Sequence, residues 1–307
     1  MCIRDRSQNV PNHQTSMLLS GHLYAYDASK TAQPELVESS KVSADSKTVT
    51  MTLKDAKYSD GTAITADDVV FALARQQGPT GQGKPFFGAV QKAVALDAHT
   101  VEWTLSEPMP FLNDLLADHF MMIHPHAQIA ADPKYFTHPV SAGPYMIQQY
   151  TPGTNSMVLV ENPNYVGGPR QVHEIDLVYT ADLSSRVIQL QSKDIDFCYD
   201  LPYNAPGMLP ADVSVGPHLV GASFVLLANV KSTTPIGNAG VRRAISLAID
   251  RANVSQIAFN GAGKPSTGVM YAGFEDHVDS LPSGGKQDIA AAKAELAATP
   301  FLSLIHI

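Results

Sequence analysis

The chain has 307 residues, 44% of them hydrophobic, and carries a formal net charge of −8 with a pI near 5.7. This composition is typical of an ordinary globular protein with room for two domains. The acidic balance argues against a nucleic-acid partner, because phosphate binding needs a basic face, and no apolar run approaches the ~18 residues of a membrane span.

Each end of the chain carries a hexapeptide that we exclude from fold reasoning. Residues 1–6 read Met-Cys-Ile-Arg-Asp-Arg and residues 302–307 read Leu-Ser-Leu-Ile-His-Ile. The two hexapeptides can be encoded by DNA strings that are reverse complements of one another, so one oligonucleotide translated from opposite strands would explain both. We identify it as a transposon adapter used in sequencing libraries. We therefore expect residues 1–6 and 302–307 to be adapter-derived artefacts. The chain would then be an internal fragment whose signal region is missing.

The first half of the chain alternates between hairpins and short helices. Residues 48–53 alternate between polar and apolar side chains, so residues 39–53 read as a hairpin. Thr65 and Asp68 have capping-box spacing ahead of an apolar helix. The other predictions are a helix then a strand over residues 10–27, hairpins over 90–105 and 145–160, short helices over 110–116 and 127–131, and a strand over 121–124.

The second half contains two further patterns of interest. Residues 175–179, 184–191 and 195–199 read as strand, helix and strand, an order that predicts a crossover in a mixed sheet. Residues 224–228 form an unbroken apolar run, which fits a strand covered on both faces. Apolar residues then recur at helical spacing over residues 241–249. Further helices are predicted after the capping residue Asp250, closing at Asn260, and over residues 289–296.

Five ordered blocks of the sequence are similar to one known family. They are residues 54–71, with Ser-Asp-Gly-Thr and Thr-Ala-Asp-Asp-Val; residues 141–145, Ser-Ala-Gly-Pro-Tyr; residues 161–169, with Asn-Pro-Asn-Tyr; residues 190–196; and residues 241–251. Together they resemble the extracellular solute-binding proteins of family 5, the oligopeptide, dipeptide and nickel receptors that serve ABC importers. One departure is Ser20-Gly21-His22-Leu23, where the family usually reads Tyr-Glu-Gly-Leu.

The resemblance implies an α/β fold of the two-lobed periplasmic-binding-protein type (type II-like), with mixed sheets and a truncated second lobe. Residues 7–34 and 139–229 would form the main sheet of lobe I, and residues 35–138 its β-rich subdomain. Residues 230–301 would begin lobe II.

The resemblance also implies a site and a location. Such a receptor closes two lobes around its ligand and needs no catalytic group, cofactor or metal. The implied partners are a peptide or other small solute and ABC permease subunits, bound by a monomer in the periplasm or another extracytoplasmic location, with a lipid anchor left open. The residues that match ligand-contacting positions are Gln8, Asn9 and Val10 through their backbone groups, His13 nearby, Phe86 as a pocket aromatic, and Phe224.

Three alternatives stay open at this point. The same fold could bind a nickel chelate. A hydrolase or metalloenzyme could use the histidines from His119 to His138, which requires His119, His124 and His138 to converge near a buried carboxylate. A cell-surface binding module without a transporter would share all the patterns above.

Overall fold

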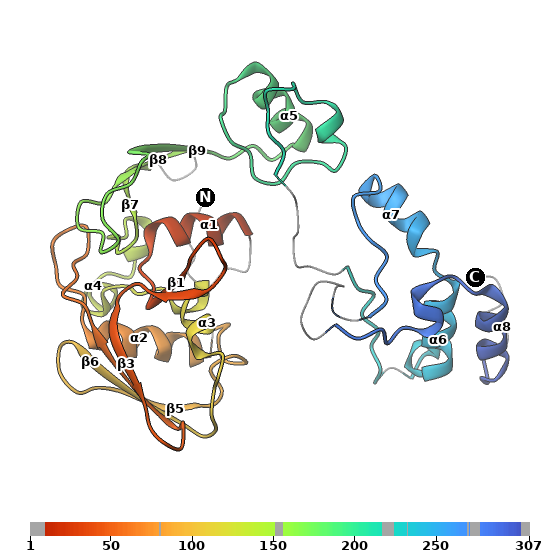
Figure 1. Ribbon diagram of the computed structural model, residues 1–307, viewed down its shortest axis with the longest axis horizontal. Helices are drawn as coiled ribbons and strands as arrows, with labels where there is room; N and C mark the ends of the chain where they lie inside the picture. Colours follow the sequence, from red (N-terminus) through yellow and green to blue (C-terminus); the bar gives the residue numbers. More distant parts are fainter. Residues whose placement is uncertain are drawn as a thin grey trace. The chain divides into compact units, whose positions relative to one another are not determined.

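The computed structural model describes residues 10–79, 81–150, 156–216, 224–231, 233–268, 270 and 277–301. The chain divides into two compact units, Met1–Tyr179 and Thr180–Ile307, and Figure 1 labels many of their helices and strands. Both terminal hexapeptides lie outside the described residues, as do Gln8 and Asn9. The predicted domain boundaries, including the one after residue 229, stay predictions.

The described part of the first unit contains three antiparallel sheets (Figure 1). Their strand orders are β1-β2, β3-β4-β6-β5 and β7-β8-β9. The strands are β1 (Tyr24–Tyr26), β2 (Ala32–Pro34), β3 (Val37–Val42), β4 (Thr48–Leu53), β5 (Val90–Ala95), β6 (Thr100–Leu105), β7 (Tyr145–Tyr150), β8 (Ser156–Glu161) and β9 (Glu174–Val178). The helices are α1 (Val10–Leu19), α2 (Ala66–Gln77), α3 (Leu112–Leu116) and α4 (His126–Ala131), with 3-10 turns η1 (His119–Met121) and η2 (Tyr135–Thr137).

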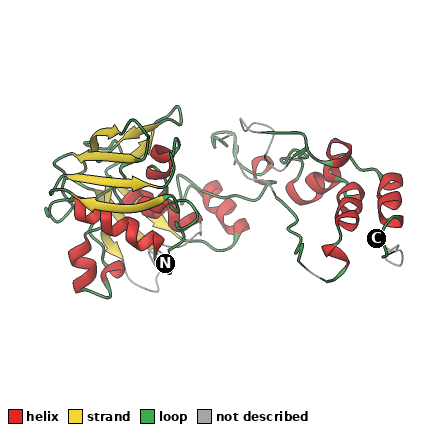
Figure 2. Cartoon of the chain, turned by 90° about the horizontal axis from the view of Figure 1, so that it is seen from below, coloured by secondary structure: helices red, strands yellow, loops and turns green. Residues whose placement is uncertain are grey.

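The largest core of the first unit lies against the four-stranded sheet. In β4 and β6 every second residue is buried, which places Met51 and Trp103 in the core. α2 packs against β5 and β6 and adds Val69 and Leu73 to this core. Figure 2 shows helices lying along one side of the strands. The three hairpins predicted from period-two alternation and turn residues are confirmed.

The turn before α2 carries the first family-like block. The Thr65 N–H donates to Asp68 Oδ2 at 2.9 Å, which closes the predicted capping box. Asp68 Oδ1 accepts the backbone N–H of His126 at 2.8 Å, at the start of α4. Asp60 Oδ2 accepts from Gln128 Nε2 at 2.7 Å. Two aspartates of this block therefore fasten α4 to the start of α2.

The second and third family-like blocks meet beside the end of α1. Asn162 Nδ2 donates to the Gly143 carbonyl at 2.8 Å, and the Gly143 N–H donates to the Leu19 carbonyl at 3.0 Å. Gly143 lies so close to α1 that an added Cβ would come 2.7 Å from its backbone. Asn164 Nδ2 donates to the Tyr58 carbonyl at 2.9 Å. Three of the family-like blocks therefore hold one another in place.

The second unit is helical over its described residues. Its elements are α5 (Leu183–Ser192), η3 (Ala205–Gly207), η4 (Pro235–Gly237), α6 (Ala239–Ala248), α7 (Arg251–Phe259), η5 (Pro282–Gly285) and α8 (Ile289–Ala297). α6 packs against α8 through Val241, Ala244 and Leu296. Asp250 caps α7 by accepting the Asn253 N–H at 3.0 Å, so the helices predicted in this region are confirmed.

None of the helices in the described part of the chain is long and apolar enough to cross a bilayer. The longest of them, α2, has 12 residues, against the ~20 that a span needs.

Two predicted strands are wrong. Residues 195–199 follow α5 without forming a strand, and β9 pairs antiparallel with β8, so no crossover forms among the described residues. Residues 224–228 have no regular secondary structure, and Leu226 and Leu227 are 74% and 87% exposed. A strand needs a neighbour to complete its backbone hydrogen bonds, and no described strand pairs with either stretch. The strand predicted over 121–124 is reduced to a single bridge between Gly21 and Ile123.

Candidate ligand-binding surface

The adjacent Phe86 and Phe87 have opposite environments. Phe87 is fully buried and meets the Trp103 ring edge-on, with ring centroids 6.2 Å apart and an interplanar angle of 86°. Phe86 is 43% exposed. Burial of one ring therefore sets the direction in which the other projects.

Side chains of α2 hold the loop that carries Phe86. Gln77 Nε2 donates to the carbonyls of Phe87 and Val90 at 2.9 and 2.8 Å. Gln76 Oε1 accepts the Gly83 N–H at 3.2 Å, and a Cβ at Gly83 would come 2.8 Å from Gln76 Cβ. The loop is thus fixed to a buried helix on both sides of the exposed ring.

The Phe86 ring stacks on a second aromatic residue from a distant part of the chain. Its centroid lies 4.6 Å from that of Phe120, with an interplanar angle of 29°. Phe120 in turn lies 4.1 Å from the His119 ring, and His119 Nδ1 contacts the carboxylate of Asp118. We call Phe86, Phe120 and His119 the aromatic stack. Its supporting turn η1 is anchored by the fully buried Met121.

Of the first candidate segment, residues 8–10, the structure describes only Val10. α1 begins at Val10 and contains His13, while Gln8 and Asn9 lie outside the described residues. α1 packs against η1 and β7. The structure therefore brings α1 next to the turn that carries Phe120, and the roles of Gln8, Asn9, Val10 and His13 stay predictions.

His22, which belongs to the Ser20-Gly21-His22-Leu23 stretch that departs from the family pattern, is buried in a polar network. Its N–H donates to Glu35 Oε2 at 3.1 Å, and the Tyr165 hydroxyl donates to Glu35 Oε1 at 2.6 Å. Burial, assisted by the nearby His124, lowers the pKa of His22 from the usual 6.5 to about 4. Burial raises the pKa of Glu35, against the opposing effect of the two hydrogen bonds. His22 is therefore a neutral imidazole near pH 7.

Of the histidines from 119 to 138, His119 and His124 both lie near the buried His22, and each contributes to lowering its pKa. His119 pairs with the partly exposed Asp118, His124 is buried and packs on the Phe136 ring at 5.4 Å, and His138 is exposed. Among the residues that the structure describes, no three His, Cys, Asp or Glu side chains form a group that could hold a metal ion. The convergence that the hydrolase alternative requires is not found among them.

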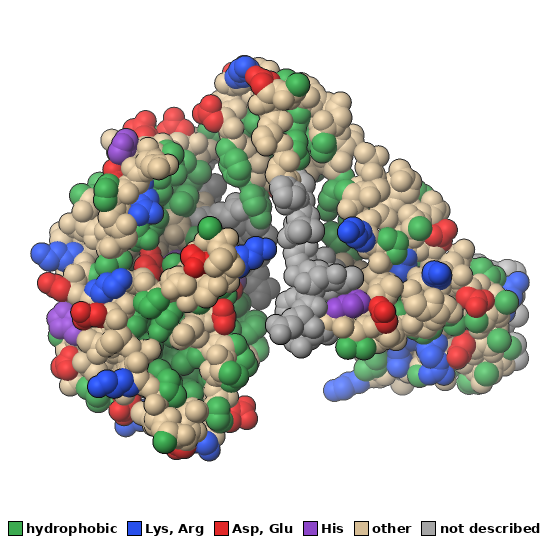
Figure 3. Space-filling model, viewed as in Figure 1, with side chains coloured by type: hydrophobic (Ala, Val, Ile, Leu, Met, Phe, Trp, Pro, Cys, Tyr) green, Lys and Arg blue, Asp and Glu red, His purple; other side chains and the backbone are tan. Residues whose placement is uncertain are grey.

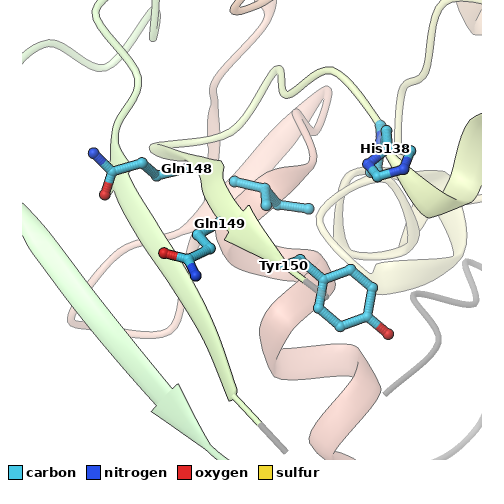
Figure 4. Close-up of a pocket in the computed structure, with 6 residues that line it drawn as sticks. His138, Gln148, Gln149 and Tyr150 are labelled. Atoms are coloured by element: carbon cyan, nitrogen blue, oxygen red, sulfur yellow. The ribbon is translucent and has the colours of Figure 1, made fainter. Parts of the chain in front are cut away.

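A pocket of about 360 Å³ lies along β7 (Figure 4), and Phe86, His119 and Phe120 are not among its lining residues. A β-bulge between Ile147 and Gln149 leaves Gln148 unpaired, which allows neighbouring side chains of one strand to line the same hollow. Figure 4 shows Tyr150 where β7 ends and His138 across from it. The lining residues are His138, Pro139, Ile147, Gln148, Gln149 and Tyr150. Of the predicted ligand contacts whose side chains the structure describes, neither Phe86 nor Phe224 lines this pocket.

Phe224 belongs to the second unit and is 78% exposed. Its ring lies 4.7 Å from that of Phe259 on α7, and Phe259 meets Tyr203 edge-on at 5.1 Å. Its predicted place on a buried strand is wrong, as described above. Its role as a ligand contact stays a prediction.

Sequence reasoning missed Phe120 and His119 as partners of Phe86. The only available signal was a His-Phe pair directly before an apolar triplet, Met121 to Ile123, which places the pair at the edge of a buried segment. Nothing local connects that pair to Phe86.

Comparison with solved structures defines the class of protein. A periplasmic binding protein of A. tumefacien R10, AgaA in complex with agropinic acid, superposes with a TM-score of 0.81 at 26% identity, covering 98% of this chain and 62% of that one. Listeria monocytogenes OppA bound to peptide superposes with a TM-score of 0.79 at 21% identity, covering 97% of this chain and 65% of that one. At this identity the similarity indicates a shared fold and nothing about the ligand. The two-lobed periplasmic-binding-protein fold predicted from the sequence is confirmed.

The family follows from the sequence comparison. Residues 31–302 match the model of the bacterial extracellular solute-binding proteins, family 5, and the chain belongs to this family. It is 33% identical to the probable D,D-dipeptide-binding periplasmic protein DdpA of Escherichia coli strain K12, over 87% of this chain and 53% of that protein. It is 28% identical to the glutathione-binding protein GsiB of Escherichia coli O6:K15:H31, over 81% and 49%. The chain thus spans about half the length of these relatives.

Proposed function

We propose that this protein is the solute-binding receptor of an ABC importer and captures peptides outside the cytoplasm. Membership of the family over residues 31–302 carries the proposal. Two relatives are named for binding a D,D-dipeptide and glutathione, which is itself a tripeptide. A fixed and exposed aromatic ring at Phe86 gives the first unit a contact suited to such a ligand.

The peptide is favoured over a nickel chelate by the side chains that are present. A chelated metal is commonly held through imidazole or carboxylate groups, and no cluster of three such groups occurs in the described part of the chain. A peptide needs apolar contacts and backbone hydrogen bonds, as in strand addition.

We further propose that binding, and not catalysis, is the activity. The Cys198 thiol has its pKa raised by burial, so it lacks the thiolate character of a nucleophile. His119 contacts the Asp118 carboxylate, His124 packs on the Phe136 ring and His138 is exposed, so these three side chains do not gather around one carboxylate.

The charge distribution supports a small solute and permease subunits as partners, without nucleic acid. On the face drawn in Figure 3, the basic side chains of the first unit are interspersed with acidic ones. With a net charge of −8, the chain lacks the basic excess that phosphate binding requires. We propose that the receptor works as a monomer in the periplasm or at the outer face of the membrane.

Isothermal titration calorimetry of the protein with dipeptides, tripeptides and glutathione, and separately with nickel-histidine, tests the proposal. We expect saturable binding of at least one peptide and none of the nickel chelate. Binding of the chelate alone would replace the peptide by a metal complex as the solute. Release of a cleaved peptide during the titration, read by mass spectrometry, would overturn the absence of catalysis.

A further inference from the structure

We propose that Asp118, His119 and Phe120 are positioning residues that hold Phe86 as a platform for an aromatic side chain of the ligand. The inference rests on the function proposed above, because the ligand is taken to be a peptide. It adds a side-chain preference to that function.

Phe120 is the central member of the stack. One neighbour is the Phe86 ring at 4.6 Å and the other is the His119 ring at 4.1 Å. Both separations lie at or below the short end of the range for stacked rings. Phe120 is itself packed against the main core of the first unit. The stack therefore joins an exposed ring to a buried and well-packed region.

The His119 end of the stack is fixed by a contact with a carboxylate. His119 Nδ1 contacts the Asp118 carboxylate, which sets the orientation of the imidazole that covers Phe120. The turn η1 that holds both residues also packs against α1, α2 and α3. The Phe120 ring is thus restrained by His119 as well as by Phe86.

Phe86 is restricted from its own loop as well. Phe87 is buried against Trp103. Gln77 Nε2 also donates to the carbonyls of Phe87 and Val90, which holds the backbone just after Phe86. A phenylalanine on a free loop would lose rotamer freedom when a ligand bound, which weakens binding. Here the backbone and one ring face are fixed before any ligand arrives.

The exposed face of Phe86 determines which side chain it prefers. Stacked aromatic pairs gain free energy beyond their buried area, equivalent to about a 2- to 10-fold preference over an aliphatic group. Phe is a weaker partner for cations than Trp or Tyr. The geometry therefore favours an aromatic ligand side chain over leucine or arginine.

Titration of the protein with three small probes, followed by NMR of its aromatic side chains, tests the inference. The probes are N-acetyl-phenylalaninamide, N-acetyl-leucinamide and N-acetyl-argininamide. We expect the phenylalanine probe to shift the ring signals of Phe86 and to bind about 3- to 10-fold tighter than the leucine probe. An equal response to all three probes, or a stronger response to arginine, would overturn the inference.

Variants then separate the platform from its supports. Phe120→Leu keeps an apolar side chain but removes the stacked ring, and we expect it to reduce the phenylalanine-to-leucine affinity ratio to about 1. His119→Gln is a second variant that leaves both phenylalanines in place, and a partial loss of the ratio is expected. Phe111→Leu is the matched control, because Phe111 is 53% exposed and lies outside the stack. If Phe120→Leu and His119→Gln both keep the wild-type phenylalanine-to-leucine affinity ratio, Phe86 needs no support from these residues and the inference is overturned.

The two proposals fail separately. A protein that binds peptides by calorimetry but shows no aromatic preference in the probe titration loses the platform and keeps the receptor function. If the protein prefers the phenylalanine probe at Phe86 but binds no peptide, the platform is supported and the proposal that the ligand is a peptide is overturned.

Discussion

Tyr165 donates a 2.6 Å hydrogen bond to Glu35 Oε1, which links the third family-like block to the segment before β3. The other carboxylate oxygen accepts the N–H of His22. Glu35 is 9% exposed, so a lost donor cannot be replaced freely by solvent. This network includes His22, which belongs to the stretch from Ser20 to Leu23 that departs from the family pattern.

The hydrogen bond from Tyr165 should stabilise the first unit measurably. Tyr165→Phe removes only the hydroxyl and leaves Glu35 Oε1 buried without it. We expect the free energy of unfolding, measured by urea denaturation, to fall by ~1–2 kcal/mol. Tyr26→Phe is the control, because the Tyr26 hydroxyl makes only an exposed 3.4 Å contact with Asp114; a similar loss in both variants would mean that the network contributes nothing special.

Stability should fall on acidification because of His22. Its pKa drops from 6.5 to about 4 on folding, so between these values the unfolded chain binds more protons than the folded one. The stabilisation is complete above pH 6.5 and is lost as the pH falls towards 4. Its size is on the order of 3 kcal/mol. The raised pKa of Glu35 acts in the opposite direction and offsets part of this loss.

Denaturation of wild-type protein and His22→Gln at several pH values isolates the histidine. We expect the variant to show a smaller decline between pH 6.5 and 4, since Gln does not titrate. His173→Gln serves as the control, because the His173 side chain is 75% exposed and pairs with Glu161 at the surface. If wild type and His22→Gln decline in parallel, the buried imidazole is not the titrating group.

Asp68 should contribute more to the stability of the first unit than its neighbour Asp67. Asp68 is buried and uses both carboxylate oxygens, one for Thr65 and one for His126. Asp68→Asn keeps the shape but leaves only one acceptor, so we expect a loss of ~2 kcal/mol in urea denaturation. Asp67→Asn changes an exposed charge in the same helical turn and should cost at most ~0.5 kcal/mol. If both variants lose the same free energy of unfolding, the negative charge near the helix N-terminus, and not the hydrogen bonds of Asp68, is what stabilises this region.

Asp68 also shows what the sequence could predict about the fold. The capping box is a local pattern, and so are the alternation in β4 and the caps at Asp250 and Asn260; each was read from a few adjacent residues. The link from Asp68 to His126 was not predicted, because it joins positions 58 residues apart. Local hydrogen bonds leave a sequence signature, whereas tertiary ones of this kind leave none.

The stretch at residues 224–228 illustrates the opposite case. Its apolar run resembles a buried strand, but strand formation depends on partners that a local pattern cannot specify. Among the described residues it has no strand partner, and its side chains are largely exposed. At the candidate surface, Phe86 was found by family resemblance, and its support from Phe120 became visible only in the structure.

Gly143 should tolerate no side chain. A Cβ there would lie 2.7 Å from the backbone of α1 and 2.8 Å from the Ser20 nitrogen, and these backbone atoms cannot rotate away as a flexible side chain could. We expect Gly143→Ala to lower the thermal midpoint and to cost ~1–3 kcal/mol in urea denaturation, since α1 must move from β7 to relieve the overlap. Gly88→Ala is the matched control in the same unit, where the nearest atom would be 3.4 Å away, and its stability should stay within ~0.5 kcal/mol of wild type. An unchanged midpoint in Gly143→Ala would mean that α1 and β7 are not packed as closely as the structure shows.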